Sequence, residues 1–251
     1  MKLRVPKPLF GWQAFTNEVG VVVFGVLLAL GAQQLVETAN ERAEAAETRA
    51  TLTSEIEESL AILELRKAAQ PCIDRRLREL RGLVNDWGRT GRFETPRWVS
   101  QATWFAFDTA RFEAAKSAGR LALLPSEEQY RFGLVVGSLN TFRDIQKRET
   151  DAWSTLRMLQ GGPEVLSASD RTAVRVALQD ASTLNHFAQI SVGQTLPQAA
   201  EFGWRPDMKR VEERMRLAWK DGRFRPSVCL SIDTPAEQAH REANLIYPLP
   251  E

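Results

Sequence analysis

The chain has 251 residues, with 33 lysines and arginines against 32 aspartates and glutamates, so its formal net charge is +1. A nucleic-acid-binding protein normally presents a sustained basic field, which this balance argues against. About 215 residues remain outside one apolar segment near the start, which is enough for a single domain with a sizeable core.

The apolar segment covers residues 19–32 and carries no charge. A bilayer core about 30 Å thick needs roughly 20 helical residues, which residues 15–34 supply if Glu18 lies at headgroup depth. We therefore predict a transmembrane helix over residues 15–36, with Trp12 and Glu18 as its anchor at the membrane interface. Two alternatives stay open, a cleaved secretory signal and a buried helix of a soluble protein.

The charges on either side of this segment predict its orientation. Lys2, Arg4 and Lys7 precede it, whereas acidic residues outnumber basic ones in the stretch that follows. Positively charged flanks stay in the cytoplasm. Residues 1–14 are therefore expected to form a cytoplasmic tail, with the chain after residue 36 on the other side of the membrane.

The N-terminus also carries a specific residue pattern. It combines Pro-Lys-Pro-Leu-Phe-Gly-Trp at residues 6–12, Glu-Val-Gly at 18–20 and a glycine-spaced apolar stretch at 25–34. This pattern resembles the anchor of an uncharacterised family of proteobacterial single-pass membrane proteins, over about residues 6–40. The resemblance implies a bacterial inner-membrane protein whose C-terminal part faces the periplasm, and it brings no established activity.

One side of the predicted membrane helix consists of small residues. Gly25, Ala29 and Ala32 recur at spacings of four and three, which places them on one helix face. Small residues let helix backbones approach closely in a bilayer. We therefore expect this face to pack on another membrane protein or on a second copy of the chain; alternatively, it faces lipid.

The helical period of apolar residues continues beyond the membrane segment, which predicts a single rod of roughly 55 residues. Pro71 is expected to end this rod, because its ring suits the first turn of a new helix. Seven glutamates lie in residues 41–64 and seven arginines in residues 74–97. We predict an antiparallel hairpin that turns near Gln70 and sets acidic side chains against basic ones. Alternatively, the arginines contact anionic lipid headgroups.

Aromatic residues gather in the middle of the chain, between residues 98 and 112. Their spacing is typical of a helical core, and the alternative is a pocket for a ligand. The residues concerned are Trp98, Trp104, Phe105, Phe107 and Phe112.

Helix signals continue through the second half of the chain. A capping box of Ser126 and Gln129 predicts one helix start, and another helix is expected from Ser169. Asp207 is expected to cap a short basic helix that Gly222 ends. No stretch longer than a few residues alternates at period two. The predicted fold is therefore all-α, with the transmembrane helix continuing into a helical bundle.

The predicted domain boundaries follow from these elements. Residues 37–222 are expected to form the periplasmic helical bundle, and residues 223–251 a mostly irregular tail that packs on it. Cys72 and Cys229 are the two cysteines, one near each end of this domain. In an oxidising compartment they can form one disulfide, and the alternative is two buried thiols.

Signatures of catalysis, metal binding and nucleotide binding are absent from this sequence. His186 and His240 are the only histidines and lie on separate predicted elements, so no multi-histidine metal site is expected. A glycine pair at 133–137 lacks the Lys-Ser/Thr ending of a phosphate loop. We therefore expect that the protein has no enzymatic activity and binds no cofactor. The predicted function is an accessory or self-associating membrane protein; the alternative is a ligand-binding or sensing module that signals through a partner.

Overall fold

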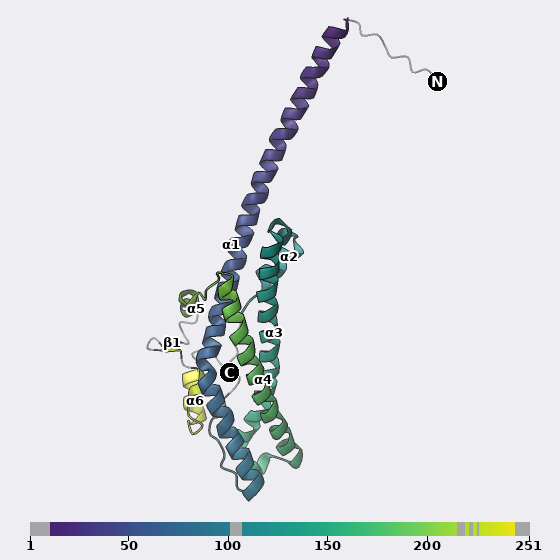
Figure 1. Cartoon of the computed structure of the whole chain (residues 1–251). Helices are drawn as coiled ribbons and strands as arrows, with labels where there is room; N and C mark the ends of the chain where they lie inside the picture. The colour runs from purple at the N-terminus through teal and green to yellow at the C-terminus, as the bar shows by residue number, and fades with distance from the viewer. Residues whose placement is uncertain (1–10, 101–106, 215–218, 221–222, 225, 244–251) are drawn as a thin grey trace, which may run out of the picture.

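The computed structural model describes residues 11–100, 107–214, 219–220, 223–224 and 226–243. Figure 1 shows a long rod whose N-terminal part projects away from the other helices. Within these ranges, regular structure is helical except for two antiparallel two-residue strands, which confirms the predicted all-α class. In chain order the elements are α1 (Gly11–Thr90), α2 (Ala110–Ser117), η1 (Arg120–Leu123), α3 (Ser126–Leu156), η2 (Arg157–Gly161), η3 (Pro163–Val165), α4 (Ala168–Glu201), α5 (Met208–Arg214), β1 (Trp219–Lys220), β2 (Arg223–Phe224), η5 (Ser227–Cys229) and α6 (Ala236–Ala243), where η marks a 3-10 helix.

Helix α1 is a single element of 80 residues with Pro71 in its interior, and at 1.5 Å per residue it is about 120 Å long. The predicted helix end at Pro71 and the hairpin near Gln70 are therefore wrong. Residues 41–64 and 74–97 follow one another along α1 and the chain just after it, so their charges cannot pair side by side. The arginines lie far from the apolar segment, so contact with headgroups of the same bilayer is wrong as well.

Burial explains why α1 continues through its proline. A proline inside a helix removes one backbone hydrogen bond and strains the preceding turn. Apolar side chains nevertheless stay buried on one face of α1 before and after that position, and their burial offsets the local loss. These side chains are Ile62, Leu65, Ala69, Ile73, Leu77 and Leu80.

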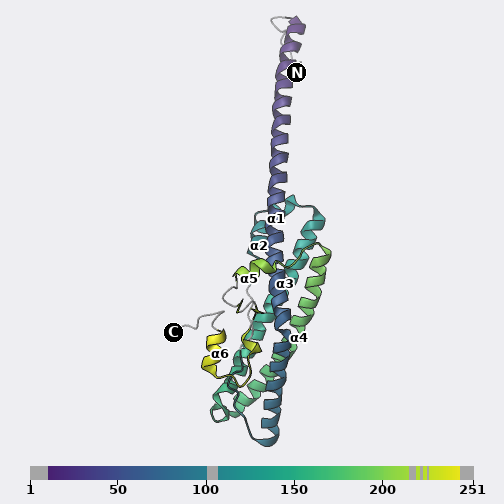
Figure 2. The ribbon, with the colours of Figure 1, turned by 90° about the vertical axis from the view of Figure 1, so that its left-hand side faces the viewer.

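Three long helices form the body of the molecule. Figures 1 and 2 show the second half of α1, α3 and α4 side by side, with α3 running in the direction of α1 and α4 returning. Helices α3 and α4 form a hairpin and pack on each other more extensively than any other pair of elements described, and the most extensive packing partner of α1 is α4. Helix α2 and η1 cover the end of this bundle that is nearer to the apolar segment (Figure 2).

The buried apolar side chains form two clusters along the bundle axis. The cluster nearer the apolar segment includes Leu52, Phe132 and Phe142. The far cluster includes Leu80 and Trp153. On α3 and α4 the two clusters occupy successive stretches with buried polar residues between them, whereas on α1 they meet over residues 60–65.

The starts of α3 and α4 use different caps from those predicted. Pro125 is the N-cap of α3, and the side chain of Gln129 donates to a carbonyl of the preceding turn, so the capping box at Ser126 is wrong. A capping box does begin α4, where Ser167 and Asp170 bond reciprocally. Both sequences match the capping pattern, and only the second pair adopts its geometry.

The short basic helix begins as predicted and ends early. The Asp207 carboxylate accepts the backbone N–H of Arg210 at 3.0 Å, which caps the start of α5. Helix α5 ends at Arg214, and Trp219 belongs to strand β1. The predicted continuation to Gly222 is therefore wrong, and Gly222 itself lies outside the described residues.

The aromatic stretch is only partly helical. Trp98 is buried in an irregular segment, and Phe112 is buried in α2. Phe107 packs against Phe142 of α3, with ring centroids 6.0 Å apart. A cavity of about 60 Å³ borders Phe107, which favours the core interpretation over a ligand pocket. Trp104 and Phe105 lie outside the described residues.

Candidate functional site

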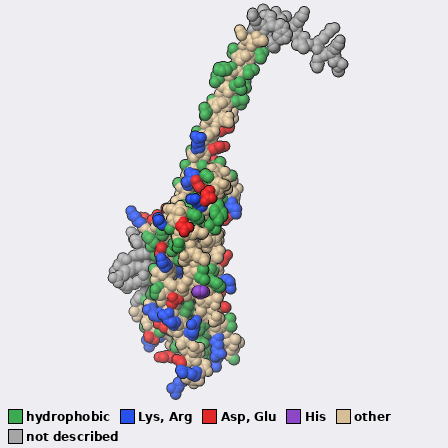
Figure 3. Space-filling view, in the orientation of Figure 1, with side chains coloured by type: hydrophobic (Ala, Val, Ile, Leu, Met, Phe, Trp, Pro, Cys, Tyr) green, Lys and Arg blue, Asp and Glu red, His purple; other side chains and the backbone are tan. Residues whose placement is uncertain are grey.

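The apolar segment lies at the free end of α1. In the part of the chain that the structure describes, α1 alone is long and apolar enough to cross a membrane. The rest of the chain buries none of its apolar window, which argues against a buried helix of a soluble protein. Figure 3 shows the hydrophobic side chains along this projecting helix.

The predicted membrane-facing residues all belong to this part of α1. Glu18, Gly25, Ala29 and Ala32 are exposed, and a Cβ added at Gly25 would meet no atom within 4 Å. Trp12 lies in the first turns of α1 and its side chain is outside the described residues. Within the described chain, no other helix therefore covers the small-residue face.

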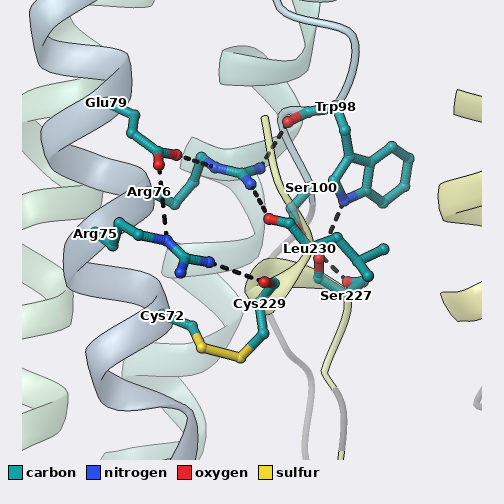
Figure 4. The surroundings of a disulfide bond; sticks show 9 residues. All are labelled: Cys72, Arg75, Arg76, Glu79, Trp98, Ser100, Ser227, Cys229 and Leu230. Atoms are coloured by element: carbon teal, nitrogen blue, oxygen red, sulfur yellow. Dashed lines mark hydrogen bonds and ion pairs between the residues drawn. A yellow bond between two sulfur atoms is a disulfide. The ribbon is translucent and has the colours of Figure 1, made fainter. Parts of the chain in front are cut away.

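A disulfide fastens the C-terminal part of the chain to α1. Cys72 of α1 is bonded to Cys229 of η5, 157 residues later, with the two Cα atoms 4.8 Å apart. Figure 4 shows the bond directly below two arginines of α1. Of the two states that the cysteine count allowed, the structure contains the disulfide.

Arg76 holds the same region by hydrogen bonds. Its guanidinium is fully buried and donates to the carbonyls of Trp98, Val99 and Leu230 at 2.6, 2.9 and 2.6 Å. Its Nε also donates to Glu79 at 2.8 Å. Burial lowers the pKa of Arg76, and the ion pair with Glu79 opposes this shift. Buried carbonyls thus find the donors that they need.

Further contacts complete this attachment, which we call the C-terminal clamp (Cys72, Arg75, Arg76, Cys229 and Leu230). Arg75 donates from its exposed side chain to the carbonyl of Cys229 at 2.8 Å (Figure 4). Trp98 donates from its indole to the carbonyl of Ser227 at 3.1 Å. The clamp therefore binds two distant segments to one turn of α1.

A polar layer lies where the two apolar clusters meet, and it consists of the buried Arg66, Glu149 and Asn185 and the half-buried Gln70 and Asp74. Arg66 donates to Glu149 at 3.1 Å and to Asn185 at 2.9 Å. Gln70 donates to Asp74 and to Asn185, and Asn185 donates to Asp74 at 2.8 Å. Charges so far from water need such partners. The layer therefore fixes how α1, α3 and α4 align along the bundle axis.

A cavity of about 350 Å³ opens between α1 and α4 beside this layer. Its wall on α4 is apolar and includes Val192, Leu196 and Pro197, whereas Arg66 and Lys67 line it from α1. A cavity of this size with few polar groups suits a small apolar molecule.

Sequence reasoning missed the polar layer, although a signal was present. Arg66 and Glu149 each lie within an apolar stripe of a helix, at positions where the period predicts a buried side chain. A charged residue at such a position indicates a buried partner. Nothing in the sequence identifies that partner, because the two residues are 83 positions apart.

Metal-ligating and titratable residues are dispersed. Among the described residues, no group of three or more histidines, cysteines, aspartates or glutamates is placed to hold a metal ion. His186 lies exposed on α4. His240 belongs to α6, and its side chain is outside the described residues.

No protein-family model, no curated protein and no solved structure matches the chain.

Proposed function

We propose that the chain is a non-enzymatic single-pass membrane protein that presents a helical domain for interaction with another membrane protein or with a second copy of itself. The continuity of α1 carries this proposal. One helix contains both the exposed apolar segment and the buried stripe of the domain. The domain thus has no flexible joint to the segment that we place in the bilayer.

The spacing along α1 supports a fixed standoff from the membrane. The predicted transmembrane helix ends at Val36, and the first buried side chain of the domain is that of Thr48. Thr48 lies twelve positions after Val36 on α1, or about 18 Å at 1.5 Å per residue. Over this interval Ala39, Ala43 and Ala46 are exposed, so the neck of α1 is open to a partner helix.

Orientation and compartment belong to the same proposal. The basic residues before the apolar segment favour a cytoplasmic N-terminus, and the resemblance at residues 6–40 favours the bacterial inner membrane. The disulfide between Cys72 and Cys229 supports an oxidising compartment such as the periplasm. A reporter that is active only in the periplasm, fused after Glu251, should be active; an inactive fusion overturns the orientation.

Association can be tested on the full chain in mild detergent. We expect either a co-migrating membrane protein or a dimer by light scattering, and both depend on the small-residue face. Gly25→Ile with Ala29→Ile should disrupt association, because bulky side chains separate the helices. The matched control changes the opposite face, with Val23→Ile and Leu30→Ile. Recovery of the unaltered chain alone and monomeric contradicts the proposal.

A second candidate function is ligand binding in the cavity between α1 and α4. The apolar wall beside the polar layer favours it. Gly193 lines this cavity, and an added Cβ there meets open space within 4 Å. Gly193→Leu should therefore fill the cavity without unfolding the chain. Detection by mass spectrometry of a small molecule on the unaltered protein but not on the Gly193→Leu variant supports this function. Detection of no small molecule on either protein contradicts it.

A further inference from the structure

A second hollow lies at the end of the bundle farthest from the apolar segment, and we call it the arginine groove. It has a volume of about 510 Å³ and lies between the last turns of α1 and the first half of α4. Its polar lining consists of three arginines and two side-chain amides, and none of its lining residues is acidic. The residues used below are Arg81, Asn85, Gly88, Arg89, Arg175 and Gln179.

The helix period brings these arginines together. Arg81 and Arg89 are eight residues apart on α1, which places them on one face of the helix. Arg175 reaches this face from α4. Its Nη2 lies 3.0 Å from the point where a Cβ on residue 88 would be, so Gly88 provides the space for that guanidinium.

The positive charge of the groove is only partly compensated inside the chain. Arg89 pairs with Asp86 at 2.7 Å, on side chains that are mostly exposed. Arg81 donates to the neutral hydroxyl of Ser182 at 2.9 Å. Arg175 makes no hydrogen bond or ion pair with any residue that the structure describes. The hairpin with residues 41–64 that would have neutralised these arginines does not exist.

We propose that the arginine groove binds a ligand that carries phosphate or carboxylate oxyanions. A guanidinium binds both groups through two parallel hydrogen bonds, and three of them around one groove suit a multiply charged ligand. Asn85 and Gln179 add neutral hydrogen-bonding groups. The groove and its charges do not depend on the anchoring proposed above.

The position of the groove points to a soluble source of these oxyanions. Asn85 lies 49 positions after Val36 on α1, or about 74 Å along the helix. A bilayer that holds the apolar segment is therefore too far away for its headgroups to enter. A free small anion or an anion on a structure far from that bilayer can reach the groove.

The test uses the full chain in an uncharged detergent, titrated calorimetrically with inorganic pyrophosphate and, separately, with citrate at moderate salt. Binding of at least one of them is expected. Arg175→Gln should weaken it at least tenfold, and Arg175→Lys by less, because the charge remains and the two-bond geometry is lost. The matched control is Arg42→Gln, which removes the same charge from an exposed site on the neck of α1 and should leave affinity unchanged.

Three outcomes overturn the proposal. The first is no binding of either anion. The second is equal weakening by Arg175→Gln and Arg42→Gln, which would mean attraction to net charge alone. The third is binding to phosphatidylglycerol vesicles without binding of the free anions, which would make a lipid surface the ligand. Thermal unfolding of each variant checks that it is folded, and the doubly altered Arg81→Gln, Arg89→Gln chain repeats the test independently of Arg175.

Discussion

Arg66 and Glu149 form an ion pair in the interior of the bundle, with Nη2 3.1 Å from the carboxylate and side chains only 1% and 3% exposed. Burial lowers the pKa of Arg66 and raises the pKa of Glu149, while their mutual attraction opposes both shifts. Each charge is thus tolerated because of the other. The pair lies at the boundary between the two apolar clusters.

Removing one member of this pair should destabilise the protein strongly. Glu149→Leu leaves the Arg66 charge buried without its carboxylate, which costs about 3–5 kcal/mol. Arg66→Met together with Glu149→Leu should recover most of that loss, because no buried charge remains. Urea unfolding followed by circular dichroism measures both. The exposed pair of Arg131 and Glu127 is the control, and Glu127→Gln should cost less than about 1 kcal/mol. A double variant that is no more stable to urea than Glu149→Leu contradicts this account.

The two adjacent arginines of the C-terminal clamp should differ in importance. Arg76→Met leaves buried carbonyls without donors and should cost about 3 kcal/mol of unfolding free energy. Arg75→Met should cost less than about 1 kcal/mol, because Arg75 is exposed to solvent. Hydrogen exchange should also rise at residues 227–232 in the Arg76 variant alone. Equal effects of the two substitutions would show that burial of Arg76 does not matter.

The disulfide closes a loop of 157 residues. In the chain-entropy model, closing so long a loop raises the free energy of the unfolded state by about 5 kcal/mol. Cys72→Ser with Cys229→Ser should lose this stability and expose residues 226–243 to limited proteolysis, while α3 and α4 stay protected. Reductant should reproduce the effect on the unaltered chain and leave the double variant unchanged. Proteolysis that begins in α4 instead would contradict the clamp.

Pro71 should be a position where stability can be gained. It is exposed, and it lacks the N–H that every other interior position of α1 donates. Pro71→Ala should raise the unfolding free energy by about 1–3 kcal/mol. Pro125→Ala is the control, because Pro125 is an N-cap and lacks no interior bond. A loss of stability on Pro71→Ala would instead show that the proline geometry is needed to place Cys72.

The capping box of α4 predicts a pH dependence. Hydrogen bonds from the Ser167 side chain and backbone lower the pKa of Asp170 below its ordinary value of 3.8. Between the folded and unfolded pKa values the unfolded state binds more protons. The contribution of Asp170 to stability is therefore present above pH 3.8 and is lost as pH falls through the folded pKa.

Comparison with Asp170→Asn isolates this contribution. At pH 6 the unfolding free energy of the unaltered chain should exceed that of the variant. This gap in unfolding free energy should shrink as pH falls below 3.8. Urea unfolding at several pH values measures the gap. In a Ser167→Ala background the donor side chain is absent, so the gap should depend less on pH. A gap that widens in acid would contradict the predicted sign.

Local patterns in the sequence predicted the helical class and the approximate starts of α3 and α4. The fate of Pro71 was not predictable from local signals, because proline and the apolar stripe point to opposite outcomes. The stripe prevails only through burial against α4, a tertiary contact. Pairing of Arg66 with Glu149 has the same origin, since α1 and α3 must first align before the two residues can meet.

Charge patterns were informative about composition and misleading about partners. The acidic residues 41–64 and basic residues 74–97 suggested mutual pairing, yet they lie in succession along one helix and its following segment. The glutamates instead meet partners elsewhere in the chain, such as Arg120 for Glu44 and Arg210 for Glu58. Which charges pair depends on where each helix ends. Because α1 continues through Pro71, the predicted pairing of residues 41–64 with residues 74–97 does not form.

An unbroken α1 also has a mechanical consequence. With the apolar segment in a bilayer, as we propose, α1 acts as a rigid lever that pivots in the bilayer and carries the domain on its long arm. Between Val36 and Thr90 that arm measures about 80 Å. A change of about 10° in the tilt of the short arm, within the range that membrane helices adopt, would swing Thr90 sideways by about 14 Å.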